Sequence, residues 1–66
     1  MNATREQVIE FIEKRLEWAT ENPKYTMEYF HQAFGAVCFY IDNLAEYDHE
    51  WDDIWNYYRE KFIELF

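Results

Sequence analysis

The sequence predicts an all-α fold, a single domain over residues 1–66 built as a small three-helix bundle with up-down-up topology. Apolar residues recur at alternating steps of three and four along most of the chain, the spacing that places side chains on one face of an α-helix. The only glycine is Gly35, which excludes glycine-rich linkers between domains. The predicted helices cover about residues 4–20, 26–46 and 49–65, with the second helix in the centre.

The first helix begins with a capping box. Thr4 is followed three residues later by Gln7, so the hydroxyl and the side-chain amide can each satisfy a backbone N–H group. The helix is expected to end before Pro23, because the residue preceding a proline is pushed out of the helical region. The expected inward row is Val8, Ile12, Leu16 and Ala19, and the expected outward row is Glu6, Glu10, Glu13 and Glu17.

The second helix carries the most apolar pattern of the chain. No Asp, Glu, Lys or Arg occurs between Tyr29 and Ile41, so the apolar arc is wider than a single neighbouring helix can cover. We therefore expect helices on both sides of it. The expected inward row is Met27, Phe30, Phe34, Val37, Ile41 and Leu44.

Small residues in the second helix give further expectations. Thr26 is the expected N-cap. Gly35 stands mid-helix, where glycine costs up to about 1 kcal/mol relative to alanine. Because Ala33 and Ala36 are small as well, we interpret this cluster as a place where another helix backbone comes close. Cys38, the only cysteine, is expected to be a small buried hydrophobe.

The boundary between the second and third helices leaves two alternatives. The three-and-four spacing continues to the end of the chain, so one unbroken helix from Thr26 onward is possible, and its uncovered apolar face would demand a dimer. Weak helix formers between Asp42 and Asp53 instead favour a break near residues 47–49, with Asp48 as the cap of the third helix. The third helix would then bury Trp51, Trp55, Tyr58, Phe62 and Leu65.

Composition restricts the classes of partner. Fourteen acidic residues against six basic ones give a formal net charge of −8. Nucleic acid and anionic membranes are therefore not expected as direct ligands, since both are recognised mainly through Lys and Arg. A basic protein surface is the favoured partner.

The sequence shows neither a secretory leader nor a run of roughly 20 apolar residues, so we expect a cytoplasmic protein.

No motif in the sequence predicts catalysis, a cofactor or a metal. Glu28 and His31, like Glu46 and His49, have the Glu-x-x-His spacing of carboxylate-bridged di-iron bundles, but such sites draw ligands from four helices. Helical geometry also directs Glu28 and His49 away from the inward rows. Cys38 lacks the electropositive setting of a reactive thiol. The chain contains no serine, and we predict a protein that is not an enzyme.

The strongest functional signal is the acidic segment from Asp42 to Asp53, which holds six carboxylates and no Lys or Arg. Its structural explanation is solubility and helix capping. Its functional explanation is a docking surface for a basic protein, in which charge speeds encounter and selects the partner. With the glutamate row of the first helix, the segment could imitate a phosphate array and inhibit a nucleic-acid-binding protein. The predicted partner-binding residues are Asp42, Glu46, Tyr47, Asp48, Glu50, Trp51, Asp52, Asp53 and Tyr57.

The alternative function is a structural homodimer or helical assembly that uses an aromatic surface. Six Phe, six Tyr and three Trp are more rings than a minimal core of this size needs, and aromatic residues are enriched at protein interfaces. Phe39 is expected on the polar side of the second helix. A twofold dimer would bury such rings and supply stability that so short a chain lacks.

Overall fold

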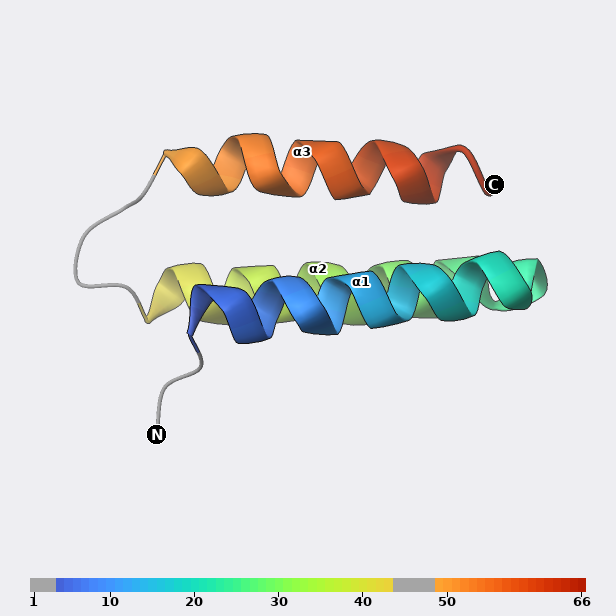
Figure 1. Ribbon diagram of the computed structural model, residues 1–66, viewed down its shortest axis with the longest axis horizontal. Helices are drawn as coiled ribbons and strands as arrows, with labels where there is room; N and C mark the ends of the chain where they lie inside the picture. The colour runs from blue at the N-terminus through green and yellow to red at the C-terminus, as the bar shows by residue number, and fades with distance from the viewer. Residues whose placement is uncertain (1–3, 44–48) are drawn as a thin grey trace.

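A computed structural model describes residues 4–43 and 49–66 of the chain. Its elements are α1 (Arg5–Glu21), a short 3-10 turn η1 (Pro23–Tyr25), α2 (Thr26–Asp42) and α3 (Glu50–Ile63). Helices α1 and α2 pack antiparallel to each other, and α3 runs back along both of them (Figure 1). The predicted up-down-up three-helix bundle is confirmed. The alternative of one unbroken helix is wrong, because α2 and α3 are separate and run in opposite directions.

The predicted capping box of α1 is present. The Thr4 Oγ1 atom accepts a hydrogen bond from the Gln7 backbone N–H at 3.2 Å, and the Gln7 Oε1 atom accepts one from the Thr4 N–H at 2.9 Å. The helix ends at Glu21, two residues before Pro23, as predicted. The Asn22 N–H donates to the Trp18 carbonyl at 2.9 Å, which closes the last turn.

The predicted cap of α2 is wrong. Thr26 is already the first residue of the helix, and Tyr25 at the N-cap position makes no side-chain hydrogen bond. The reason is η1, which leads the chain directly into α2. The Thr26 hydroxyl donates backward to the Pro23 carbonyl at 2.6 Å, and the residue is 2% exposed.

The later helix boundaries also differ from the prediction. Helix α2 ends at Asp42 rather than at residue 46, because the Asn43 side-chain amide donates to the Phe39 carbonyl at 2.7 Å and completes the last turn. Helix α3 ends at Ile63 rather than at residue 65, in a tight turn where the Phe66 N–H donates to the Ile63 carbonyl. The predicted cap Asp48 lies outside the described residues. His49 occupies the N-cap position without a side-chain capping bond.

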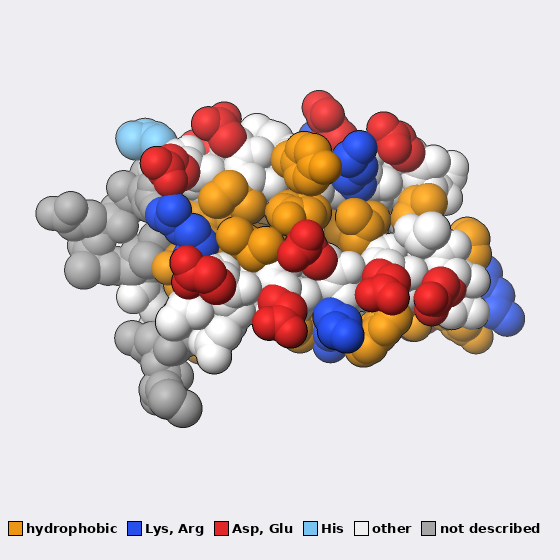
Figure 2. All heavy atoms as spheres, viewed as in Figure 1, with side chains coloured by type: hydrophobic (Ala, Val, Ile, Leu, Met, Phe, Trp, Pro, Cys, Tyr) orange, Lys and Arg blue, Asp and Glu red, His pale blue; other side chains and the backbone are white. Residues whose placement is uncertain are grey.

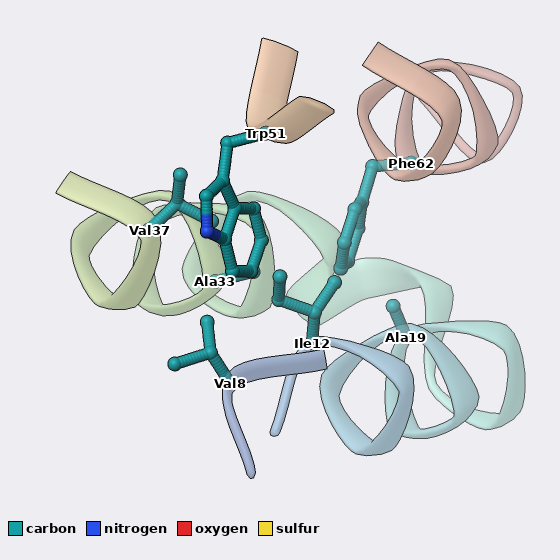
Figure 3. Close-up of a cluster of buried hydrophobic side chains, with 7 residues drawn as sticks. All are labelled: Val8, Ile12, Ala19, Ala33, Val37, Trp51 and Phe62. Carbon is teal, nitrogen blue, oxygen red and sulfur yellow. The ribbon is translucent and has the colours of Figure 1, made fainter. Parts of the chain in front are cut away.

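The core draws apolar side chains from all three helices. Trp51 and Phe62 point from α3 towards Ile12 of α1, and Ala33 and Val37 of α2 lie beside Trp51 (Figure 3). The inward rows predicted for α1 and α3 are thus largely confirmed, with Leu16, Trp55, Tyr58 and Leu65 partly buried at the edge of the core. The buried apolar residues within the described ranges are Val8, Ile12, Ala19, Ala33, Val37, Trp51 and Phe62.

The inward row predicted for α2 is partly wrong. Met27 is 54% exposed and Phe34 is 45% exposed, whereas Ala33 and Val37 are buried. The buried side of α2 is centred on its small residues, which let α1 approach closely. Phe34 lies at the edge of α3, where its ring contacts Trp55 on one side and remains 45% exposed. Leu44 lies outside the described residues.

The interpretation of Gly35 is wrong as well. A Cβ atom at this position would meet nothing within 4 Å, so no helix backbone approaches it. The small residue of this cluster that is fully buried is Ala33. Side chains two positions apart on a helix point in nearly opposite directions. Ala33 and Gly35 therefore cannot both face the same neighbouring helix. Cys38 is a free thiol that is only partly buried.

Candidate protein-binding site

Trp51 is not a surface anchor. Its side chain is 0% exposed and packs against Tyr40, with the two ring centroids 5.0 Å apart. The ring is buried because it lies on the same side of α3 as Phe62. Its Nε1–H has no hydrogen-bond acceptor among the described residues. The prediction that Trp51 belongs to the partner-binding surface is therefore wrong.

The other residues predicted from the acidic segment are only partly brought together. Glu46, Tyr47 and Asp48 lie outside the described residues. Asp42 is exposed at the end of α2, and Glu50, Asp52 and Asp53 are exposed in the first turn of α3.

Two of the carboxylates in α3 have basic neighbours. The Arg5 Nη1 atom donates to the Glu50 Oε2 atom at 2.9 Å and ties the start of α1 to the start of α3. The His49 Nδ1 atom lies 4.0 Å from the Asp52 Oδ2 atom. The Glu50 carboxylate is therefore paired with a cation of this chain.

Neighbouring carboxylates of α3 also point to different sides of the bundle. Successive helical residues are separated by about 100° around the axis. Asp53 lies one turn before Tyr57, on the side towards α1, whereas Asp52 lies on the side of Trp55, towards α2. The predicted cluster is divided between two faces.

The structure places Tyr57 in a groove between α1 and α3, which we call the acidic groove. It has a volume of about 320 Å³. On this face of the molecule, apolar side chains form a strip between the two helices, and carboxylates lie on both sides of the strip (Figure 2). The groove is lined by Glu13, Leu16, Glu17, Thr20, Tyr57, Tyr58 and Lys61.

Two tyrosines form one wall of the acidic groove. Tyr57 is 58% exposed and packs edge-on against Tyr58, with ring centroids 5.1 Å apart. The Lys61 Nζ atom lies 5.2 Å from the Tyr57 centroid. The pKa of Tyr58 is raised, first because burial disfavours the phenolate, and then because the nearby Glu13 carboxylate repels that charge and accepts a hydrogen bond from the neutral phenol. Tyr58 is therefore a neutral hydrogen-bond donor, and Tyr57 offers an open ring face.

The sequence alone could not assemble the acidic groove. Glu13 and Glu17 belong to the outward row predicted for the first helix, and Tyr57 was assigned to the acidic segment. The two glutamates meet Tyr57 only because α1 and α3 pack side by side in one particular register, and these helices are distant in sequence. That register depends on how Ile12 and Phe62 meet in the core, which periodicity along one helix does not specify.

A second exposed surface, which we call the aromatic face, lies between α2 and α3. The Phe30 ring is stacked on Phe34 at 6.5 Å, and both contact Trp55, at 5.8 Å and 5.6 Å between centroids. Phe66 contacts Phe30 at 5.9 Å. Because α2 lies behind α1 in Figure 1, the acidic groove faces the viewer and the aromatic face lies on the far side. The residues of the aromatic face are Met27, Phe30, Phe34, Trp55 and Phe66.

A third groove, of about 510 Å³, lies between α1 and α2. Its main feature is Arg15, whose guanidinium carbon lies 3.7 Å from the Phe11 centroid and 4.5 Å from the Trp18 centroid. The Arg15 Nε–H donates to the Gln32 Oε1 atom at 3.0 Å. The guanidinium is thus engaged in holding the two helices together.

Phe39, expected on the polar side of α2, is 69% exposed.

Among residues 4–43 and 49–66, no three His, Cys, Asp or Glu side chains are grouped so that they could hold a metal ion. In the same ranges, no helix has both the length and the apolar character needed to cross a membrane.

Comparison of the chain with protein families, with curated proteins and with solved structures finds no match.

Proposed function

We propose that this protein is a non-enzymatic binding module whose acidic groove receives a basic segment of another protein. The observation that supports this proposal is the exposed Tyr57 ring, which lies in one groove with Glu13 and Glu17. A Lys or Arg side chain of the partner would lie on the ring face, where a cation is attracted by the π electrons. The two carboxylates would pair with its charge and with that of its neighbours.

Lys61 supports this chemistry from within the chain. Its ammonium group already lies within 5.2 Å of the Tyr57 centroid, so this ring accepts a cation without rearrangement. An incoming cation would use the remaining ring face or replace Lys61. The net charge of −8 would attract a basic partner before contact and would raise the association rate more than the final affinity.

Within this class, we favour a nucleic-acid-binding protein as the partner. Such proteins carry arrays of Lys and Arg that recognise regularly spaced negative charges. Glu13 and Glu17 are four residues apart, which places them about 6 Å apart along the axis of α1. That distance is close to about 6.8 Å, the axial separation of every second phosphate on one strand of DNA. The protein would then act as an inhibitor that imitates phosphate.

The experiment is affinity capture with the immobilised chain at low and at high salt. The binding variant is Glu13→Lys/Glu17→Lys, and the matched control is Glu21→Lys/Glu28→Lys, which changes the net charge equally at exposed positions outside the groove. We expect proteins that the control retains at low salt to be absent from the groove variant. Duplex DNA should release them if they are nucleic-acid-binding proteins. Identical retention by both variants would refute the proposal.

A further inference from the structure

The aromatic face is a contiguous apolar surface rather than a set of isolated rings. Met27, Phe34 and Phe66 are 54%, 45% and 60% exposed, and ring contacts through Phe30 and Trp55 connect the two phenylalanines into one patch. Single exposed apolar residues are ordinary, but contiguous patches mark interaction sites. This patch is separate from the acidic groove, because it lies on the opposite broad side of the bundle.

The charges around the aromatic face favour a second copy of the same chain. Two chains of net charge −8 repel each other through their acidic sides. Helix α2 carries no Asp, Glu, Lys or Arg between Tyr29 and Ile41, so two copies can approach closely through this face. The side of α3 that contributes Trp55 carries one charge of each sign, Asp52 and Arg59.

The order of these two charges along α3 determines how two α3 helices can be oriented in a dimer. Asp52 and Arg59 are seven residues apart, about two helical turns or 10.5 Å along α3, with Trp55 between them. If two α3 helices lie antiparallel about a twofold axis near Trp55, each Asp52 faces the partner's Arg59. A parallel arrangement would place like charges together. Arg59 is exposed and makes no hydrogen bond or ion pair with any described residue, while Asp52 already lies 4.0 Å from His49.

The bundle has two broad sides, each large enough to hold a dimer interface of standard size. The bundle measures 36 × 23 × 15 Å along its principal axes. A dimer that used the whole of one broad side would bury about 800 Å² per chain, the area that each partner contributes to a standard protein interface, with the aromatic face as its apolar part. We propose that the aromatic face is covered by a second copy of this chain, in a twofold dimer whose α3 helices are antiparallel.

The first test is the mass of the full chain in solution over a range of concentrations, by sedimentation equilibrium. We expect a dimer for the wild type and a monomer for Phe34→Ser/Phe66→Ser. The control Phe39→Ser, on another side of α2 and 69% exposed, should remain dimeric. Circular dichroism establishes that each variant is helical. A wild type that stays monomeric at millimolar concentration overturns the proposal, and so does a folded Phe34→Ser/Phe66→Ser variant with unchanged association.

The second test addresses the orientation and uses only exposed charges. Arg59→Asp places carboxylates opposite each other in the antiparallel dimer and should raise its dissociation constant about tenfold. Adding Asp52→Arg to that variant reverses both charges and should restore the wild-type constant. If Arg59→Asp leaves the constant unchanged, or if the double exchange fails to restore it, the antiparallel arrangement is wrong.

Discussion

Replacing Trp51 with alanine should remove most of the stability of this protein. The side chain is 0% exposed, and Figure 3 places it in the middle of the core, pointing from α3 towards α1 and α2. An aromatic side chain buries about 150–250 Å², which corresponds to about 4–6 kcal/mol at 25 cal/mol per Å². Truncations of buried tryptophan to alanine cost about 3–5 kcal/mol. A domain of this length is stable by only about 3–10 kcal/mol.

The assay is urea unfolding followed by far-ultraviolet circular dichroism, with two comparisons. Trp51→Phe keeps a large ring and deletes the Nε1–H group that has no acceptor among the described residues, so its loss should be roughly half that of alanine or less. Trp18→Ala removes a tryptophan of α1 that is 38% exposed, and it should cost less than Trp51→Ala because less apolar area is lost.

The result separates two roles for Trp51. A Trp51→Ala variant that loses less than about 1 kcal/mol would contradict its place in the core, since that is the size of an ordinary surface effect. Trp51 would then be available to a partner, as the sequence first suggested. A large loss of stability in the isolated protein, with no partner present, supports burial.

Three further predictions concern local features. Gly35→Ala should raise the free energy of unfolding by about 0.5–1 kcal/mol in urea titrations, because the new methyl group meets nothing within 4 Å; a loss of stability would contradict the open surroundings of this residue. Thr4→Ala should lower it by about 1 kcal/mol through loss of the capping box, and an unchanged midpoint would mean that the cap does not form in solution. Tyr58 has a raised pKa, so its contribution to stability is fully present below about pH 10, the pKa of an unfolded tyrosine, and is lost as the pH rises through the folded value. The stability of the wild type relative to Tyr58→Phe should therefore decrease above about pH 10, and equal pH profiles would refute the shift.

Features with a local signal were predictable from the sequence. The capping box at Thr4 and the helix end before Pro23 depend on residues close together in the chain. The inward sides of α1 and α3 were also located, because charged residues on their outer sides define the apolar stripe. Ile12 and Phe62, at the centres of those stripes, are fully buried.

Features that depend on how helices meet were not predictable in the same way. Helix α2 is apolar on most of its circumference, so its periodicity identifies a helix but not its buried side. The prediction placed Phe34 inside and a close helix contact at Gly35, whereas Phe34 is 45% exposed, Gly35 has open surroundings, and the neighbouring Ala33 is the buried residue. The acidic groove depends likewise on α1 lying beside α3, which brings Glu13 to Tyr58 although the two are distant in sequence.

The bundle is only 15 Å thick, and its two candidate surfaces occupy opposite sides of that thin slab. Two such slabs joined back to back through their rings would display one Tyr57 on each outer side, facing away from each other. The assembly would be bivalent. Two basic segments tethered to each other could engage both sides at once, and avidity would strengthen their retention by about 10²–10⁴-fold without any additional contact within either groove.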